Sequence, residues 1–149
     1  MKLAAIGSGA WGKNIVRTLH QLDALGAVAE AFPHLREQLA VDFPGLEIVP
    51  DFHGLLSRPD ITAVTIATPA ASHHRIAKAC LLAGKDVFVE KPMTMASSEA
   101  QDLIDTAEAS GRILMVGHLL LYKPAIQFIR DYLAARSLGR VFTMHQERM

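Results

Sequence analysis

The fold of this chain is decided by residues 2–12, KLAAIGSGAWG. A short apolar run ends in a G-x-G-x-x-G motif, and an amphipathic helix pattern follows at once. In that setting Gly7 allows a tight turn, Gly9 lets the backbone approach a pyrophosphate, and Gly12 lets the helix pack closely on the strand. The first N–H groups of the helix then face the phosphates. The motif predicts dinucleotide binding, and the alternative is an ordinary glycine-rich turn.

Length and composition bound the class of protein. The chain has 149 residues, half of them hydrophobic, which suits one domain with a full core. Its 15 basic and 15 acidic residues balance, so we expect neither a nucleic-acid nor a membrane-surface partner. The single cysteine, Cys80, reads as a buried thiol, which fits a reducing cytoplasm. The N-terminal apolar run is too short for a signal peptide, so we expect a cytoplasmic protein.

Strand and helix patterns alternate along the chain. The strand segments are continuous apolar runs, which is typical of strands covered on both faces. Helical spacing of apolar residues lies between them. Alternation with short links predicts an α/β protein with a doubly wound parallel sheet, a Rossmann fold. The predicted strands are 3–6, 27–32, 46–49, 63–68, 86–90 and 113–117.

The end of the chain departs from this pattern. Residues 124–135 read as a helix, and residues 140–149 read as one long strand. A lone strand after a complete six-strand unit needs a partner sheet. We therefore predict a dinucleotide-binding domain over 1–123, with 124–149 as a linker helix and the first strand of an otherwise missing substrate domain. The alternative is a seventh strand on the edge of the same sheet.

An acidic residue follows the second predicted strand at the distance expected from the glycine motif. Glu30 lies 18 residues beyond Gly12 and can accept hydrogen bonds from the ribose hydroxyls of an adenosine. Its charge would repel a 2′-phosphate, so the sequence favours NAD over NADP. Arg36 could hold such a phosphate, but its place in a predicted helix favours a solvated charge. The alternative for Glu30 is an exposed acid at a strand end.

Two further strand ends deliver polar residues to the same edge of the sheet. Thr68 and Pro69 follow the fourth strand, where the crossover of the sheet is expected, and His73 begins the next helix. Glu90 and Lys91 follow the fifth strand. Partial desolvation beside a cationic nicotinamide would favour the neutral amine of the lysine, which could then pass a proton or bind a substrate hydroxyl. The alternative is a surface Glu-Lys pair.

The sixth strand end supplies the last candidates. His118 follows that strand, and Tyr122 comes shortly after it. The alternative for the histidine is a residue satisfied by backbone groups at a helix start. No metal site is predicted, because the seven histidines are scattered and the adjacent His73 and His74 cannot readily face one ion from a helix. Pro92 is a candidate for a preceding cis peptide.

These motifs together resemble the Gfo/Idh/MocA oxidoreductases. The resemblance rests on GSGAWG at 7–12, ATP at 67–69 with His73, and EKP at 90–92, and it covers essentially the whole chain. The stretch VGHLLLYKPA at 116–125 is similar to the branch that acts on nucleotide-linked sugars, including 3-dehydrogenases of UDP-N-acetylglucosaminuronic acid. Many members carry arginine where Leu121 stands.

The resemblance implies hydride transfer from a secondary hydroxyl of a sugar or nucleotide-sugar to NAD. It implies that Lys91 contacts the substrate hydroxyl as the catalytic residue, with His118 and Tyr122 on the substrate side. It also implies a possible homo-oligomer. The implied cofactor-binding residues are Gly7, Gly9, Ala10, Trp11, Gly12, Glu30, Thr68, Pro69, His73 and Glu90.

One departure from the family concerns length. Its members are about twice as long, and their second domain walls the substrate pocket and supplies further acid–base groups. Lys91 would lack those partners here, so we expect dinucleotide binding with little or no turnover by these residues alone. The competing readings are a non-catalytic dinucleotide-binding module or sensor completed by another chain, and an NADP-dependent reductase of small carbonyls, which Glu30 opposes.

Overall fold

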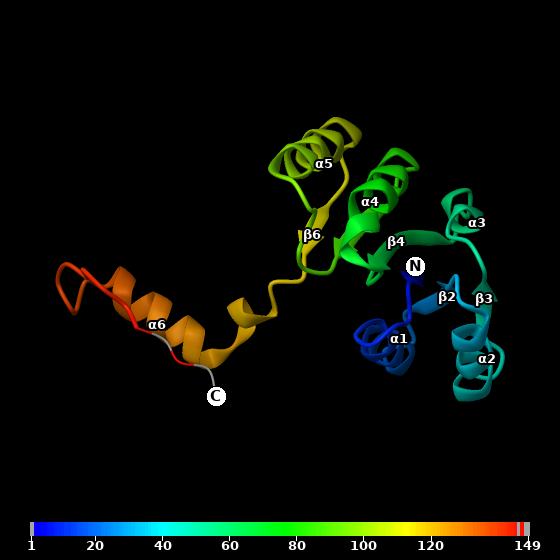
Figure 1. Ribbon diagram of the computed structural model, residues 1–149, viewed down its shortest axis with the longest axis horizontal. Helices are drawn as coiled ribbons and strands as arrows, with labels where there is room; N and C mark the ends of the chain where they lie inside the picture. Colours follow the sequence, from blue (N-terminus) through cyan, green and yellow to red (C-terminus); the bar gives the residue numbers. More distant parts are fainter. Residues whose placement is uncertain (1, 146, 148–149) are drawn as a thin grey trace. The chain divides into compact units, whose positions relative to one another are not determined.

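A parallel six-stranded sheet forms the centre of the protein. The computed structural model describes residues 2–145 and 147. The strand order is β3-β2-β1-β4-β5-β6, with every neighbouring pair parallel (Figure 1). The predicted doubly wound α/β fold is confirmed. The strands are β1 (Lys2–Ile6), β2 (Leu25–Ala29), β3 (Glu47–Val49), β4 (Ile61–Ile66), β5 (Asp86–Val89) and β6 (Leu114–Val116).

Helices cover the sheet through two separate hydrophobic clusters. Val16 and Leu39, from the first two helices, pack with Ala5 and Val28 of the sheet. Leu103 belongs to the larger cluster, which joins the later helices to the other face. Figure 1 shows α1 and α2 apart from α3, α4 and α5. The helices are α1 (Gly12–Gln21), α2 (Pro33–Asp42), α3 (His53–Leu56), α4 (His73–Leu82) and α5 (Ser97–Ser110), with a 3₁₀ turn η1 (Ala70–Ser72) before α4.

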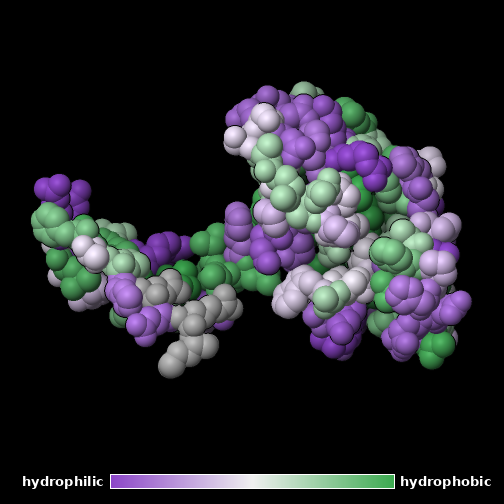
Figure 2. All heavy atoms as spheres, in the orientation of Figure 1, coloured by the Kyte–Doolittle hydropathy of each residue, from purple (hydrophilic) through white to green (hydrophobic). Residues whose placement is uncertain are grey.

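The second strand is shorter at its end than the sequence predicts. The expected strand 27–32 is observed as Leu25–Ala29. Pro33 is the first residue of α2, and Phe32 is its N-cap, so the chain has to leave the sheet before them. Figure 2 shows many hydrophilic residues over α5, whose buried residues are Leu103 and Ala107.

The chain divides into two compact units, Met1–Gly117 and His118–Met149. The second unit contains a 3₁₀ turn η2 (Leu119–Tyr122) and the helix α6 (Pro124–Ala134), close to the predicted helix. The predicted strand over 140–149 is wrong for residues 140–145 and 147, which form no strand. A strand needs a partner to hydrogen-bond, and the described residues offer it none. Residues 146, 148 and 149 lie outside the described part.

The sequence-based domain boundary at 123/124 stays a prediction, as does the assignment of 124–149 to a substrate domain. Within the described part of the chain, no helix is long and apolar enough to cross a membrane.

Candidate functional site

The carboxyl ends of β1 and β4 form the point at which the sheet changes winding direction. The two strands are neighbours, and their connecting helices cover opposite faces, so their following loops diverge above a crevice. The loops are in close contact: a Cβ built on Gly7 would lie 2.8 Å from the Ala67 carbonyl oxygen and 2.9 Å from Thr68 Cγ2. The predicted glycine loop and the turn after β4 therefore share one site.

The three glycines of the motif have different surroundings. Gly7 has φ +89°, a left-handed conformation that glycine adopts without strain. A Cβ on Gly12 would overlap the carbonyl oxygen of Gly7, so the start of α1 lies directly on the turn. A Cβ on Gly9 would meet nothing within 4 Å. The space beside Gly9 is thus open to a ligand, which is the condition for backbone approach to a pyrophosphate.

The residues between Gly9 and Gly12 form the rim of this loop. Ala10 is exposed, and Trp11, which precedes α1, is half-exposed. The backbone N–H groups of these two residues donate to no acceptor within residues 2–145 and 147. Unpaired N–H groups at a helix start favour an anion there.

Glu30 is buried beneath the glycine loop. Its Oε2 accepts hydrogen bonds from the Ser8 N–H and the Ser8 hydroxyl, both at 2.7 Å, and its Oε1 accepts from the Phe32 N–H at 3.0 Å. Burial opposes ionisation, but these hydrogen bonds outweigh it and hold the pKa of Glu30 below its ordinary value. The reading of Glu30 as an exposed strand-end acid is wrong, because it is 4% exposed.

The hydrogen bonds of Glu30 limit what else it can bind. A carboxylate has about four acceptor positions, two on each oxygen. Oε2 already has two donors and Oε1 has one. One further hydroxyl can therefore bond to Oε1 without displacing a protein group, which is fewer than the pair of ribose contacts expected from the sequence.

Arg36 is held at the end of β2. Its Nη1 donates to the carbonyl oxygens of Glu30 at 2.9 Å and of Ala31 at 2.7 Å. The expectation of a solvated charge at Arg36 is wrong, because unpaired carbonyl groups of the outgoing strand lie within its reach.

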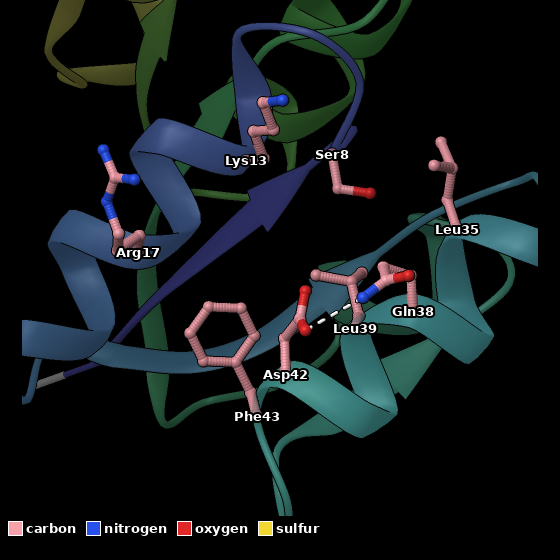
Figure 3. A pocket seen from close by; sticks show the side chains of 8 residues that line it. All are labelled: Ser8, Lys13, Arg17, Leu35, Gln38, Leu39, Asp42 and Phe43. Carbon is pink, nitrogen blue, oxygen red and sulfur yellow. Dashed lines mark hydrogen bonds between the residues drawn. The ribbon is translucent and has the colours of Figure 1, made fainter.

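A groove that the sequence did not reveal runs between α1 and α2 beside the glycine loop (Figure 3). It has a volume of about 480 Å³, and Ser8 lies at the end nearest the loop. Lys13 and Arg17 of α1 add two positive charges to one wall, and Asp42 of α2 carries a negative charge. The remaining lining residues are Leu35, Gln38, Leu39 and Phe43.

The turn after β4 is tied together by its own side chains. Thr68 Oγ1 lies 2.7 Å from Ser72 Oγ, which donates to the Pro69 carbonyl oxygen at 2.7 Å. His73 begins α4 and is 1% exposed, so its ring does not line an open groove. Its ring nitrogens instead face two carbonyl oxygens, those of Thr68 and Pro92.

Glu90 and Lys91 occupy different environments at the end of β5. Glu90 is buried, and its Oε1 has no hydrogen-bond partner in the described residues, while its Oε2 accepts from the Lys91 N–H at 3.2 Å. Lys91 is exposed. The surface Glu-Lys pair is therefore not observed. A Cβ on Gly117 would lie 3.0 Å from Glu90 Oε1, so this glycine makes room for the carboxylate. The Lys91–Pro92 peptide is cis.

An unpartnered carboxylate oxygen in a buried position favours a ligand that brings a donor. Together with the open space at Gly9, this makes the crevice fit a dinucleotide with hydroxyl groups along its length. His118 and Tyr122 belong to the second unit and are exposed, so their role at the crevice stays a prediction. No group of three or more metal-ligating side chains occurs in the described residues.

Comparison with known proteins assigns the family. Residues 1–118 match the model of the Gfo/Idh/MocA oxidoreductase family, described as an NAD-binding Rossmann fold. The chain belongs to this family. The match confirms the resemblance seen in the sequence and, with it, a nicotinamide cofactor.

Individual relatives are similar over nearly the whole chain. A 4-carboxy-2-hydroxymuconate-6-semialdehyde dehydrogenase of Sphingobium is 29% identical over 93% of this chain and 45% of its own length. An inositol 2-dehydrogenase of Pseudomonas fluorescens is 28% identical over 97% of this chain and 45% of its own. The solved UDP-N-acetylglucosamine 3-dehydrogenase of Acidithiobacillus ferrooxidans superposes with a TM-score of 0.80 at 28% identity, over 88% of this chain and 42% of its own. The chain thus spans under half the length of these relatives.

Proposed function

We propose that the unit Met1–Gly117 binds NAD in the crevice between the β1 and β4 loops. We further propose that it is the cofactor half of an oxidoreductase acting on a secondary hydroxyl of a sugar or nucleotide-sugar. The observation that carries the proposal is the open space beside Gly9 at the crossover of the sheet. The bound nicotinamide would supply the hydride acceptor, and the protein would supply binding and orientation.

The cofactor contacts follow the path of the crevice. The pyrophosphate would lie along the loop from Gly7 to Gly12, against the N–H groups of Ala10 and Trp11. Glu30 Oε1 would accept one adenosine-ribose hydroxyl. Thr68 and Pro69 would border the central part of the cofactor, and Glu90 Oε1 would accept a hydroxyl of the nicotinamide ribose.

We propose NAD as the preferred cofactor because of the charge of Glu30. Hydrogen bonds keep this carboxylate ionised, and an ionised carboxylate repels a 2′-phosphate on the adjacent ribose. Lys13 and Arg17 in the α1–α2 groove act in the opposite direction, since two cations attract a phosphate. In this proposal the buried carboxylate of Glu30, next to the adenosine ribose, outweighs the two cations and sets the preference for NAD.

Lys91 is the group we propose to act on the substrate. Its exposed amine can reach a substrate hydroxyl above the crevice, and His118 and Tyr122 would contribute to the substrate side. Inositol and UDP-N-acetylglucosamine in the names of two relatives support a polyol or sugar as the substrate class. We also propose a cytoplasmic protein with small-molecule ligands, no nucleic-acid or membrane partner, and a homo-oligomeric state.

A second candidate function is a non-catalytic dinucleotide-binding module completed by another chain. It is favoured by the Lys91 side chain, which makes no hydrogen bond or ion pair within the described residues. General acid–base catalysis needs a second group within hydrogen-bond reach. On either function, we expect little or no sugar-dependent NAD reduction by these 149 residues alone.

The test is a titration of the purified chain with NADH, followed by energy transfer from Trp11, the single tryptophan, with NADPH as the comparison. Saturable NADH binding with weaker NADPH binding is expected. A folded sample that binds neither would overturn the proposed cofactor site. Equal or tighter NADPH binding would overturn the role given to Glu30. A parallel assay of NAD reduction with inositol or UDP-N-acetylglucosamine should show little or no turnover, and saturable turnover would overturn both that expectation and the binding-module function.

A further inference from the structure

His73 connects two loops of the crevice that come from different strands. Its Nδ1 lies 2.8 Å from the Pro92 carbonyl oxygen, and its Nε2 lies 2.9 Å from the Thr68 carbonyl oxygen. Thr68 belongs to the turn after β4, and Pro92 belongs to the segment after β5. The ring therefore spans the two loops from beneath, at 1% exposure.

The chemistry of the two partners constrains the ring. A carbonyl oxygen accepts a hydrogen bond and cannot donate one. A neutral imidazole carries one N–H, so one of its nitrogens would set a lone pair against a carbonyl oxygen. The ring therefore donates to one of the two carbonyls when it is neutral and can donate to both when it is protonated. Buried polar contacts of this kind are costly when left unsatisfied.

The position of Lys91 depends on this arrangement. The Glu90 N–H donates to the Ile66 carbonyl oxygen at 2.9 Å, which attaches the start of the 90–92 segment to β4. The His73 ring holds the end of that segment through the Pro92 carbonyl oxygen. Lys91 stands between these two anchors with an exposed side chain.

We propose that His73 is a positioning residue that fastens the β4 turn to the 90–92 segment through its two ring nitrogens and so sets where Lys91 stands. It acts through two backbone carbonyls and does not line the cofactor groove, in contrast to the role that the family resemblance implied. The part of this inference that concerns Lys91 rests on the proposed function, whereas the link between the loops does not.

The histidine that follows His73 in the chain is engaged elsewhere. His74 Nε2 lies 2.6 Å from Asp102 Oδ2, and Lys78 Nζ donates to the same carboxylate. The His73 ring instead faces the two carbonyl oxygens.

The first test needs no variant and no cofactor. The ring N–H of His73 in the ¹⁵N-labelled chain is observed by ¹H–¹⁵N correlation. A hydrogen-bonded ring proton that exchanges slowly with water is expected, because both ring nitrogens face carbonyl oxygens and the residue is 1% exposed. A ring proton that exchanges as fast as that of an exposed histidine would overturn the proposal.

The second test uses His73→Gln and His73→Phe, with His74→Gln as the matched control. Glutamine can donate to one of the two carbonyls, and phenylalanine to neither. Hydrogen exchange at the Lys91 amide should rise about tenfold or more in His73→Phe, less in His73→Gln, and remain unchanged in the control, which alters only the ion pair with Asp102. Unchanged exchange in a folded His73→Phe would contradict the inference.

NADH titration separates this inference from the proposed function. A chain with a slowly exchanging His73 ring proton that fails to bind NADH would overturn the cofactor site and leave the loop link intact. A chain that binds NADH while His73→Phe leaves exchange at the Lys91 amide unchanged would do the reverse.

Discussion

Replacing Gly12 with alanine would place a methyl group against the turn that precedes α1. The new Cβ would overlap the carbonyl oxygen of Gly7, lie 2.9 Å from the Gly7 carbonyl carbon, and lie 3.3 Å from Ala67 Cβ. Two of these neighbours are backbone atoms, which cannot rotate away. The same substitution at Gly9 would meet nothing within 4 Å. The pair therefore separates folding from cofactor binding with one chemical change.

The expected magnitudes differ accordingly. Overpacking a buried position costs about 1–3 kcal/mol, and the overlap with the Gly7 carbonyl group, which is backbone, places Gly12→Ala near the upper end. Greater helix propensity of alanine returns at most about 1 kcal/mol, so a net loss of about 2 kcal/mol is expected. For a unit of this size that lowers Tm by roughly 8 °C. Gly9→Ala should change stability by less than about 0.5 kcal/mol.

The assay combines thermal unfolding with the NADH titration on both variants. Gly9→Ala should fold normally and bind NADH at least about tenfold more weakly, a loss of about 1.4 kcal/mol, because the methyl group fills the space proposed for the pyrophosphate. Gly12→Ala with the stability of the wild type would refute the close packing of turn and helix. Wild-type affinity in Gly9→Ala would refute the placement of the pyrophosphate.

Three further predictions concern charge and burial. Glu30→Gln should raise the affinity for NADPH relative to NADH in the same titration. Since the pKa of Glu30 is lowered on folding, its contribution to stability is complete above about pH 4.5 and is lost as the pH falls through the folded value; acid unfolding of Glu30→Gln, followed by circular dichroism, should lack this component. Lys13→Ala combined with Arg17→Ala should weaken NADPH binding more than NADH binding, and an equal effect on both would argue against a phosphate-attracting groove. Burial raises the pKa of the Cys80 thiol to about 12, so a disulfide reagent at pH 8 should label it only through unfolding, at a rate that increases with denaturant.

Much of the fold follows from patterns within short windows of sequence. The glycine motif between a strand and a helix predicts β1, α1 and their turn. The continuous apolar runs, which alternate with helices, predict a parallel sheet. The failure of the strand prediction at residues 140–145 and 147 has a physical cause, since a strand-like sequence measures the capacity to pair and the described residues supply no partner strand. The side-chain pattern alone cannot distinguish a segment that has a partner strand from one that has none.

The site was harder to predict because its details depend on contacts between distant segments. Glu30 and Lys91 were found from their places after strands. The bond between Glu30 and Ser8 joins residues 22 apart, and the bond between His73 and Pro92 joins residues 19 apart. No local signal encodes either contact. His73 was singled out from its place at a helix start, but nothing in the sequence showed that its ring is buried between two loops while His74 pairs with Asp102.

The central pairing of the sheet has a consequence for biosynthesis. β1 pairs with β2 on one side and with β4 on the other, with Leu3 opposite Ala63, so its second partner comes about sixty residues later in the chain. When the nascent chain has emerged from the ribosome as far as β3, the complete glycine motif and Glu30 are outside. The turn of Ala67 and Thr68, against which Gly7 packs, is not yet available. Recognition of a nucleotide by the nascent protein would therefore begin abruptly, once the fourth strand emerges, and would report that the two halves of the sheet have joined.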